Sequence, residues 1–465
     1  MWLIGPMWRA LRSSRDFRLL VIGELVSRSG SAASFVAVWS VGVYEFGVSP
    51  GVLSLLALCN TLPRVVASMV SGRMVDRHGP RVVLLVANVI GLLGSLAQFA
   101  SPTPLTLGLA SIVAGVGFGA FMPAIGSMTP RVVEERHLLP ANAVLELTWQ
   151  IGFIIGPLAG ALSILIGGTR APLLFDIATF VVAIGCIAAL RLRPIVPADA
   201  TDATESIETA EAVDAAEAAR TGDAEPAPAH AARSGDGFLA SLRYTWSLPV
   251  ARFVLVLNCG SWISISFFIV LEPLFVDQVL QMGPAVLGLL QTAFGVGAIV
   301  GAALAARAER RVTPMLVALT IGICGTGMIL YTVTSSVVVA AAGVAWWGVG
   351  LGLWAPFART MIHRGVPVTH HGRVNGVMSS LQSGLEVVPV LAAGQLAGII
   401  GIQATLVGAG VGSLVLAGWG CVMAPTISRT AVSHVTSEDE RIASPPRAEP
   451  PAEDGVASVP DAFTA

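Results

Sequence analysis

Twelve apolar stretches, each long enough to cross a lipid bilayer, constrain the fold of this chain more than any other feature. They lie at about 18–42, 50–71, 82–100, 105–127, 141–166, 171–190, 250–275, 284–305, 314–333, 336–358, 374–400 and 402–424. A helix crosses the hydrocarbon core with about 20 residues, and only helices and closed barrels satisfy the backbone polar groups in lipid. Hydrophobic residues make up 54% of the chain and charged residues 12%, which excludes a soluble globular protein. We predict an all-α membrane protein with twelve transmembrane helices.

The positions of the arginines predict how these helices are oriented. In a twelve-span arrangement almost all of the arginines near the ends of the stretches fall on one side, whereas Arg170 stands alone on the other side. The first set comprises Arg9, Arg12, Arg15, Arg18, Arg73, Arg77, Arg81, Arg131, Arg136, Arg191, Arg193, Arg307, Arg310, Arg311, Arg364, Arg373 and Arg429. Basic residues accumulate on the cytosolic side of membrane proteins. We therefore expect a multi-pass protein of a bacterial inner or plasma membrane with both termini in the cytosol.

Two polar segments divide the chain into predicted domains. Residues 194–236 are rich in Ala, Pro and acidic residues, and residues 425–465 are polar and rich in proline. Neither has enough apolar residues to build a core, so we expect a disordered acidic linker and a disordered tail, both cytosolic. Residues 1–193 are predicted to form an N-terminal six-helix bundle. Residues 237–424 are predicted to form an amphipathic interfacial helix followed by a C-terminal six-helix bundle.

The two halves of the chain share an internal repeat. The pattern Gly115-Val-Gly-Phe-Gly119, with a later proline, arginine and asparagine, recurs as Gly348-Val-Gly-Leu-Gly352 with the same spacing to the same residue types. The positions differ by 233 in each case (348 against 115, 375 against 142), and this offset also aligns Asp76-Arg77 with Glu309-Arg310. A parallel repeat of six helices predicts a substrate site near the membrane midplane, between two bundles.

A charged segment between the second and third stretches carries the most specific motif, Gly72-Arg-Met-Val-Asp76-Arg77-His-Gly79-Pro-Arg81. Its charges would be costly inside hydrocarbon, so the segment is expected at the membrane surface. It resembles the signature of the major facilitator superfamily between the second and third helices. The match covers Gly72, Asp76, Arg77, Gly79 and Arg81, although a proline stands at 80 where the family usually has a basic residue. The resemblance implies a gating motif in which Asp76 meets the start of the eleventh helix, near Gly372 to Asn375, when the inner gate is closed.

The fifth stretch contains a second motif, formed by Gly152, Gly156, Pro157 and Gly160. Glycines four residues apart lie on one helix face, which favours close packing of helices. The motif resembles the antiporter motif of the superfamily, which is associated with exporters, and ordinary helix packing is the alternative interpretation. Drug/proton antiporters of the superfamily usually carry an arginine in the fourth helix at the position of Ser111. Coupling of protons through such an arginine is therefore excluded.

The run of shorter matches resembles the enterobactin-exporter and drug-efflux branch of the superfamily. These matches are Phe17 to Leu20, Leu62-Pro63, Asp176 and Gly372-Arg373-Val374, whereas Ser31 replaces an acidic residue found in many members. The resemblance implies a secondary active transporter that exports a siderophore-like metabolite or an antibiotic by alternating access, coupled to protons. An uptake permease of the same fold and a non-transporting membrane sensor or scaffold remain alternatives.

Polar residues at membrane depth are the candidates for coupling and substrate binding, because an ionisable group there is costly unless it lines water or has a partner. They are Glu24, Arg28, Glu146, Gln150, Asp176 and Glu386. Counting along the helices places Arg28 and Glu386 near the midplane on opposite halves of the chain. We predict that these two residues act in coupling, with Glu386 as the proton carrier. In the alternative interpretation, Arg28 is held by Glu24, four residues earlier on the same helix.

Other classes of protein find no support in the sequence. No cluster of nucleophile, acid and base or of metal ligands emerges, so neither an enzyme nor a metal or cofactor site is predicted. The arginines are dispersed instead of forming a basic stripe, which argues against nucleic-acid binding. The chain contains no lysine and so no phosphate-binding loop of the Gly-Lys-Ser/Thr type, and ATP is not expected to drive it. We expect a monomer whose partners are a small-molecule substrate, protons and lipid.

Overall fold

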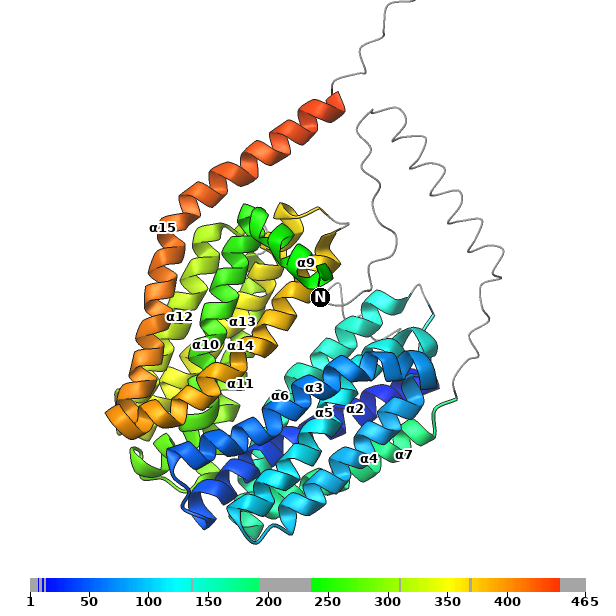
Figure 1. Cartoon of the computed structure of the whole chain (residues 1–465), viewed down its shortest axis with the longest axis vertical. Helices are drawn as coiled ribbons and strands as arrows, with labels where there is room; N and C mark the ends of the chain where they lie inside the picture. Colours follow the sequence, from blue (N-terminus) through cyan, green and yellow to red (C-terminus); the bar gives the residue numbers. More distant parts are fainter. Residues whose placement is uncertain are drawn as a thin grey trace, which may run out of the picture.

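The computed structural model is built from helices (Figure 1) and describes residues 7, 11, 14–134, 137–191, 236–308, 311–367 and 370–443. Twelve of its helices are long and apolar enough to cross a membrane, which confirms the predicted all-α, twelve-span fold. The spanning elements are α2 (Arg15–Ser40) with the π-helical turn η1 (Val41–Glu45), α3 (Pro50–His78), α4 (Pro80–Phe99), α5 (Pro104–Val132), α6 (Leu138–Gly167), α7 (Ala171–Ala188), α10 (Pro249–Gln278), α11 (Pro284–Ala308), α12 (Pro314–Thr332), α13 (Val337–Gly365), α14 (His371–Ile400) and α15 (Ile402–Ala443).

Prolines and glycines set the limits of many of these helices. Proline occupies the first turn of α3, α4, α5, α10 and α12, where its missing N–H would have no helical partner. Gly79 has a φ of 81° and is the single residue between α3 and α4, a conformation that favours glycine. The charged segment is therefore mostly helical, because Gly72 to His78 form the last turns of α3.

The spanning helices form two bundles, α2 to α7 and α10 to α15 (Figure 1). The bundles contact each other mainly through two pairs of helices, α6 with α11 and α3 with α14. Figure 1 shows them converging at one end and diverging at the other. The diverging end carries the junction of α3 and α4, the start of α10 and the far end of α15, and we call it the linker side.

The internal repeat corresponds to the same helix contact in both bundles. A Cβ added to Gly119 of α5 would lie 2.2 Å from the carbonyl oxygen of Arg64 in α3. A Cβ added to Gly352 of α13 would likewise lie 2.1 Å from the carbonyl oxygen of Ala298 in α11. Glycine thus lets the two backbones of each pair touch. Glu309-Arg310, the remaining part of the sequence repeat, lies outside the described residues.

The segments outside the spans agree only partly with the expectations. The amphipathic helix forms as α9 (Asp236–Ser247), but the expectation of disorder from residue 425 is wrong for 425–443, where α15 continues to Ala443. No glycine interrupts this stretch, and extending an existing helix costs less than nucleating a new one. The linker at 194–235, the tail at 444–465 and the arginines at 9, 12, 136, 193 and 310 lie outside the described residues.

Candidate functional site

One ion pair joins the two bundles midway along their helices. Arg64 stands 14 residues from both Pro50 and His78, the ends of α3, and Glu386 stands near the middle of α14. Nη2 of Arg64 donates hydrogen bonds to both carboxylate oxygens of Glu386, at 2.8 and 2.9 Å. The Arg64 side chain is 31% exposed and that of Glu386 11%. The pair is thus partly sheltered, and it links two helices that belong to different halves of the chain.

The contact between α3 and α14 continues from this ion pair in one direction only. Away from the linker side, the N–H of Gly394 donates to Ser54 Oγ at 2.9 Å, and a Cβ on Gly394 would lie 2.5 Å from the carbonyl oxygen of Pro50. Toward the linker side, a Cβ on Gly72 or Gly372 would meet nothing within 4 Å. The two helices are therefore sealed on the side opposite the linker, whereas the bundles diverge on the linker side (Figure 1).

The second seam, between α6 and α11, lies on the same sealed side. A Cβ on Gly288 would lie 2.5 Å from the carbonyl oxygen of Pro157, and the rings of Phe153 and Phe294 meet edge to face at 6.0 Å. Nearby, the Tyr44 hydroxyl donates to the carbonyl oxygen of Met282 at 2.8 Å. Uncharged groups make these contacts, so packing holds this seam together.

The glycines of the predicted antiporter-like motif face α2, within the N-terminal bundle. A Cβ on Gly156 would lie 2.4 Å from the Cβ of Ala32, and one on Gly160 would lie 3.3 Å from the Cα of Ala33. A Cβ on Gly152 would lie 2.8 Å from the Cβ of Arg28. The motif thus contacts α2 through its glycines and α11 of the opposite bundle through its proline. It therefore lies between Arg28 and the seam of α6 with α11.

Arg28 is held inside the N-terminal bundle and does not contact Glu386. Its Nε donates to Glu24 Oε1, the partner proposed in the alternative interpretation. Its guanidinium lies 4.0 Å from the ring centroid of Trp149 and 5.6 Å from that of Phe121, in the range of cation–π attraction. Arg28 is therefore enclosed by α2, α5 and α6.

The other candidate polar residues lie apart from the inter-bundle pair. Glu146 and Gln150 are exposed on α6, one on either side of Trp149. Asp176 of α7 is buried and accepts a hydrogen bond of 2.5 Å from Ser95 Oγ of α4. The structure thus brings Glu24 together with Arg28 and leaves Asp176 inside the N-terminal bundle.

The charged motif lies at the linker side, where the bundles diverge. Asp76 and Arg77 are exposed, and Asp76 makes no hydrogen bond or ion pair with any residue that the structure describes. Arg81 Nη2 donates to the carbonyl oxygen of Ala188 at 2.7 Å, which joins the start of α4 to the end of α7. The predicted contact of Asp76 with α14 concerns a closed gate, whereas the bundles diverge at this end here (Figure 1), and the contact stays a prediction.

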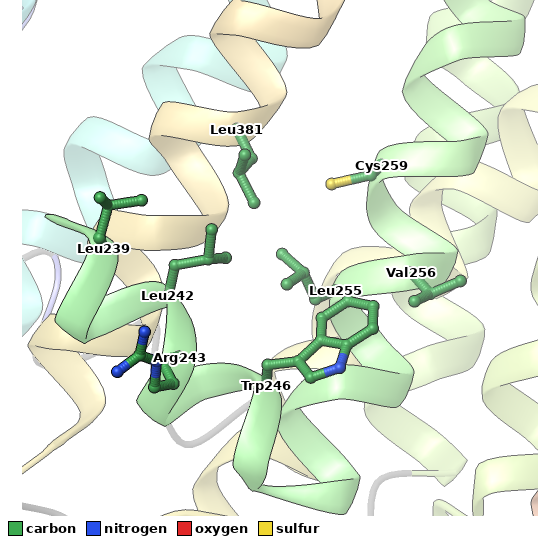
Figure 2. A pocket seen from close by; sticks show the side chains of 8 residues that line it. All are labelled: Leu239, Leu242, Arg243, Trp246, Leu255, Val256, Cys259 and Leu381. Carbon is green, nitrogen blue, oxygen red and sulfur yellow. The ribbon is translucent and has the colours of Figure 1, made fainter.

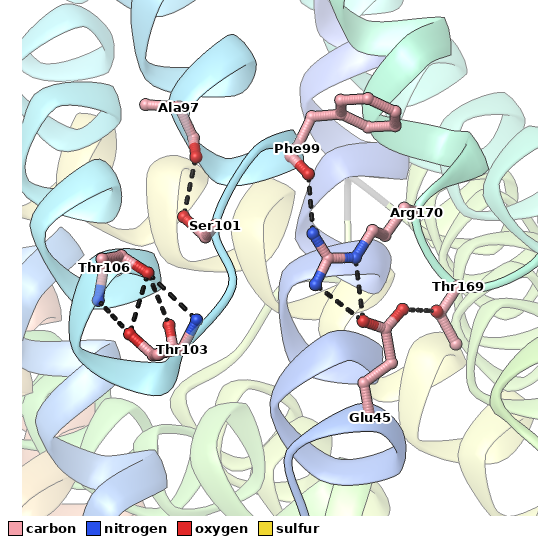
Figure 3. Close-up of polar contacts among 8 residues, drawn as sticks. All are labelled: Glu45, Ala97, Phe99, Ser101, Thr103, Thr106, Thr169 and Arg170. Carbon is pink, nitrogen blue, oxygen red and sulfur yellow. Dashed lines mark hydrogen bonds and ion pairs between the residues drawn. The ribbon is translucent and has the colours of Figure 1, made fainter.

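Arg170, the lone arginine on the opposite side, ties the ends of the N-terminal bundle together (Figure 3). Its Nε and Nη2 each lie 2.8 Å from Glu45 Oε2, and Nη1 donates to the carbonyl oxygen of Phe99 at 2.7 Å. Thr169 donates to the other oxygen of Glu45. This network connects η1, the end of α4 and the turn between α6 and α7. Arg170 thus has a role within one bundle and none at the seams.

Sequence reasoning missed Arg64 as a candidate. The signal was present, because an arginine lies in the middle of the second apolar stretch and such a position is functional or paired as a rule. Asn60 lies four residues earlier, a spacing at which two side chains can meet on one helix face. In the structure Asn60 bonds to the carbonyl oxygen of Ser111, and Arg64 reaches across to Glu386.

Two membrane bundles that meet along two seams, are open at one end and share an ion pair at half depth define a membrane transporter fold. Comparisons with known proteins agree with this geometry. The family model described as Major Facilitator Superfamily matches residues 20–388. The chain therefore belongs to the major facilitator superfamily and is a multi-pass membrane transporter.

Relatives with a described activity cover most of the chain. The multidrug efflux pump Tap of Mycolicibacterium fortuitum is 25% identical over 417 residues, which are 86% of this chain and 93% of that protein. The enterobactin exporter EntS of Escherichia coli O1:K1 / APEC is 24% identical over 384 residues, 79% of this chain and 76% of that one.

Solved structures with the same fold are more distant in sequence. A mutant of the nucleoside transporter NupG superposes with a TM-score of 0.67 at 11% identity, covering 88% of this chain and all of that one. A bacterial homologue of the iron transporter ferroportin in an inward-facing state gives a TM-score of 0.63 at 15% identity, covering 89% and 98% of the two chains.

Proposed function

We propose that this protein exports a small organic molecule across the cytoplasmic membrane, with its linker side facing the cytosol, and that protons drive the export. The observation that carries the proposal is the Arg64–Glu386 ion pair, which bridges two bundles that are sealed on one side and open on the other. The efflux activities named for the relatives support export, and the arginine-rich ends on the linker side support the orientation.

The position of the ion pair makes it suitable for coupling. When bundles rock about a midplane site, the two sides open in turn, and contacts between the bundles must break and form again. An ionised Glu386 holds Arg64 through charge-assisted hydrogen bonds, which are stronger than neutral ones. A proton on Glu386 removes its charge and weakens this contact, so protonation of Glu386 releases α14 from α3. We therefore assign Glu386 as proton carrier with Arg64, and not Arg28, as its partner.

The side chains around Arg28 support one substrate class. Trp149 covers the guanidinium of Arg28 and is itself 39% exposed, with Glu146 and Gln150 exposed beside it on α6. Aromatic and polar groups side by side suit an aromatic, amphipathic molecule. We propose that such a molecule enters from the linker side and stacks on Trp149.

Everted membrane vesicles test the proposal, because export from the cell becomes uptake into the vesicle. Ethidium and enterobactin serve as probes, each with and without an acid vesicle interior. We expect one of them to accumulate only when the interior is acid. Inward flux in right-side-out vesicles without accumulation in everted ones would identify an uptake permease. Absence of flux in both preparations would favour a sensor or scaffold.

A further inference from the structure

A pocket of about 530 Å³ lies in the linker-side half of the C-terminal bundle, between α9, α10 and α14. Figure 2 shows Leu242 of α9, Leu255 and Cys259 of α10 and Leu381 of α14 around a common space. Its volume is within the range of about 300–1,000 Å³ that is typical of sites for small organic ligands. The pocket is separate from the Arg64–Glu386 pair and from Trp149, so the proposed export mechanism does not account for it.

The walls of the pocket are apolar. On α9, Leu239, Leu242 and Trp246 share one helix face, and on α10, Leu255 and Cys259 do so. Leu239 is 63% exposed and Trp246 50% exposed, so α9 leaves much of its apolar face uncovered by protein. An amphipathic helix of this kind, with a tryptophan at the membrane surface, typically lies among lipids.

The rim of the pocket is positively charged. Arg243 lines it, and Arg252 stands on the same face of α10 as Leu255 and Val256, nearer the linker side. Neither Arg243 nor Arg252 makes a hydrogen bond or ion pair within the part of the chain that the structure describes. These walls and this rim suit a molecule that has an apolar chain and an anionic head.

We propose that the pocket binds an anionic glycerophospholipid from the leaflet on the linker side. One acyl chain lies between α9, α10 and α14, and the phosphate contacts Arg243 and Arg252. Anionic lipids are attracted to such arginines, and a free phosphate would leave the apolar walls unfilled. The lipid also secures the contact of α9 with the start of α14, where Arg373 Nε donates to Ser241 Oγ at 2.8 Å and Tyr244 stacks on His370 at 4.5 Å.

Cys259 reports on occupancy of the pocket, because its thiol lies in the wall and is free and partly exposed. The full-length protein is placed in nanodiscs of phosphatidylcholine, with or without phosphatidylglycerol, and alkylated with N-ethylmaleimide. Mass spectrometry then gives the rate at each cysteine. If phosphatidylglycerol fills about nine-tenths of the sites, the alkylation of Cys259 should be roughly tenfold slower, because only the empty sites react. Cys186, which is also partly buried but lies on α7, should be alkylated at the same rate in both lipids.

Variants separate charge from packing in this experiment. Arg243→Gln with Arg252→Gln should abolish the slowing by phosphatidylglycerol. The control variant Arg307→Gln with Arg311→Gln, in the last turn of α11 and just beyond it, should retain the slowing. Leu381→Trp fills the pocket and should slow the alkylation of Cys259 in both lipid mixtures. This variant tests the site even where the double arginine variant fails to fold.

Three results would overturn the proposal. They are equal Cys259 rates of the unaltered protein in the two lipid mixtures, slowing that persists in the Arg243→Gln, Arg252→Gln variant, and equal slowing by inorganic phosphate in phosphatidylcholine alone. The last would assign the arginines to a soluble anion. Transport plays no part in the measurement, so failure of the proposed export function leaves this result unchanged.

Discussion

Two ion pairs lie inside the membrane-spanning region, and they differ in what they connect. Glu24 and Arg28 are four residues apart on α2, and both are almost fully buried, with 3% and 11% of their side chains exposed. Arg64 and Glu386 are 322 residues apart and belong to different bundles. Breaking a buried pair costs about 3–5 kcal/mol. For Glu24–Arg28 this cost lowers the stability of one bundle. The Arg64–Glu386 pair is more exposed, and breaking it changes the balance between two arrangements of the bundles.

The largest effect is expected from Glu386→Gln, which removes the charge and nearly keeps the shape. The variant should bind substrate and perform downhill exchange but should lose accumulation against a gradient, because no proton is carried. Uptake and exchange in everted vesicles measure the two activities separately. Full pH-driven accumulation by Glu386→Gln would refute the role of this pair and move attention to Glu24, Glu146 and Asp176. Glu134→Gln, at an exposed carboxylate on the linker side, is the matched control.

Exchanging the two charges tests whether the Arg64–Glu386 pair holds the bundles together. Arg64→Glu alone places two carboxylates together and should abolish transport, since like charges in contact are unfavourable. The double variant Arg64→Glu, Glu386→Arg restores an ion pair and should recover the thermal stability and the sealed side of the protein. A cysteine introduced at Ser54, which is buried in the seam, reports on that side through its rate of alkylation. A double variant whose Ser54→Cys is alkylated as fast as in Arg64→Glu would show that the pair does not hold the bundles together.

Glu24→Gln should affect folding more than coupling. It leaves Arg28 without its carboxylate, in a site enclosed by Trp149 and Phe121, and should lower the free energy of unfolding by about 3 kcal/mol. Thermal denaturation of the purified protein measures the loss, and transport per folded molecule should remain pH-driven. If Glu24→Gln keeps its stability but loses accumulation, the roles assigned to the two pairs are reversed.

Asp76→Asn should have a smaller effect on transport. If Asp76 meets the N-terminus of α14 in the closed gate, its charge favours that state by about 1 kcal/mol, a shift of roughly fivefold. The variant should therefore reach the membrane normally, transport more slowly and expose linker-side cysteines more. Asp277→Asn, near the end of α10 on the opposite side, serves as control. Unchanged transport by a well-expressed Asp76→Asn protein would contradict the family resemblance at this residue.

No effect on flux is expected from deleting Thr201 to Ala227. The composition of this segment offers no core to lose, and the remaining linker still joins the two bundles. Flux in everted vesicles should equal that of the full chain after correction for the amount of protein in the membrane. Loss of transport by a deletion variant that reaches the membrane would show that the linker does more than connect.

Local patterns predicted much of the fold but only one of the two ion pairs. The spans and the close-packing glycines follow from stretch length and from a spacing of four residues, and the same spacing identified Glu24 as a possible partner of Arg28. Counting residues gave the depth of Glu386 but not the direction in which it points around α14. Its partner depends on which helices meet between the bundles. The end of α15 was mispredicted because composition was considered without the continuity of the preceding helix.

The sealed side of the molecule has a consequence for how membrane voltage acts on the protein. Gly394 and Ser54, and Gly288 and Pro157, meet through uncharged groups, so the electric field does little work when these contacts separate. One charge that crosses the whole membrane gains about 2.3 kcal/mol per 100 mV. Neutralising Glu386 leaves Arg64 uncompensated at half depth, where the same voltage contributes roughly 1 kcal/mol. A voltage dependence of transport would therefore originate at Arg64 and at the proton that Glu386 carries, and changes to the seams would alter the speed of transport without altering its response to membrane potential.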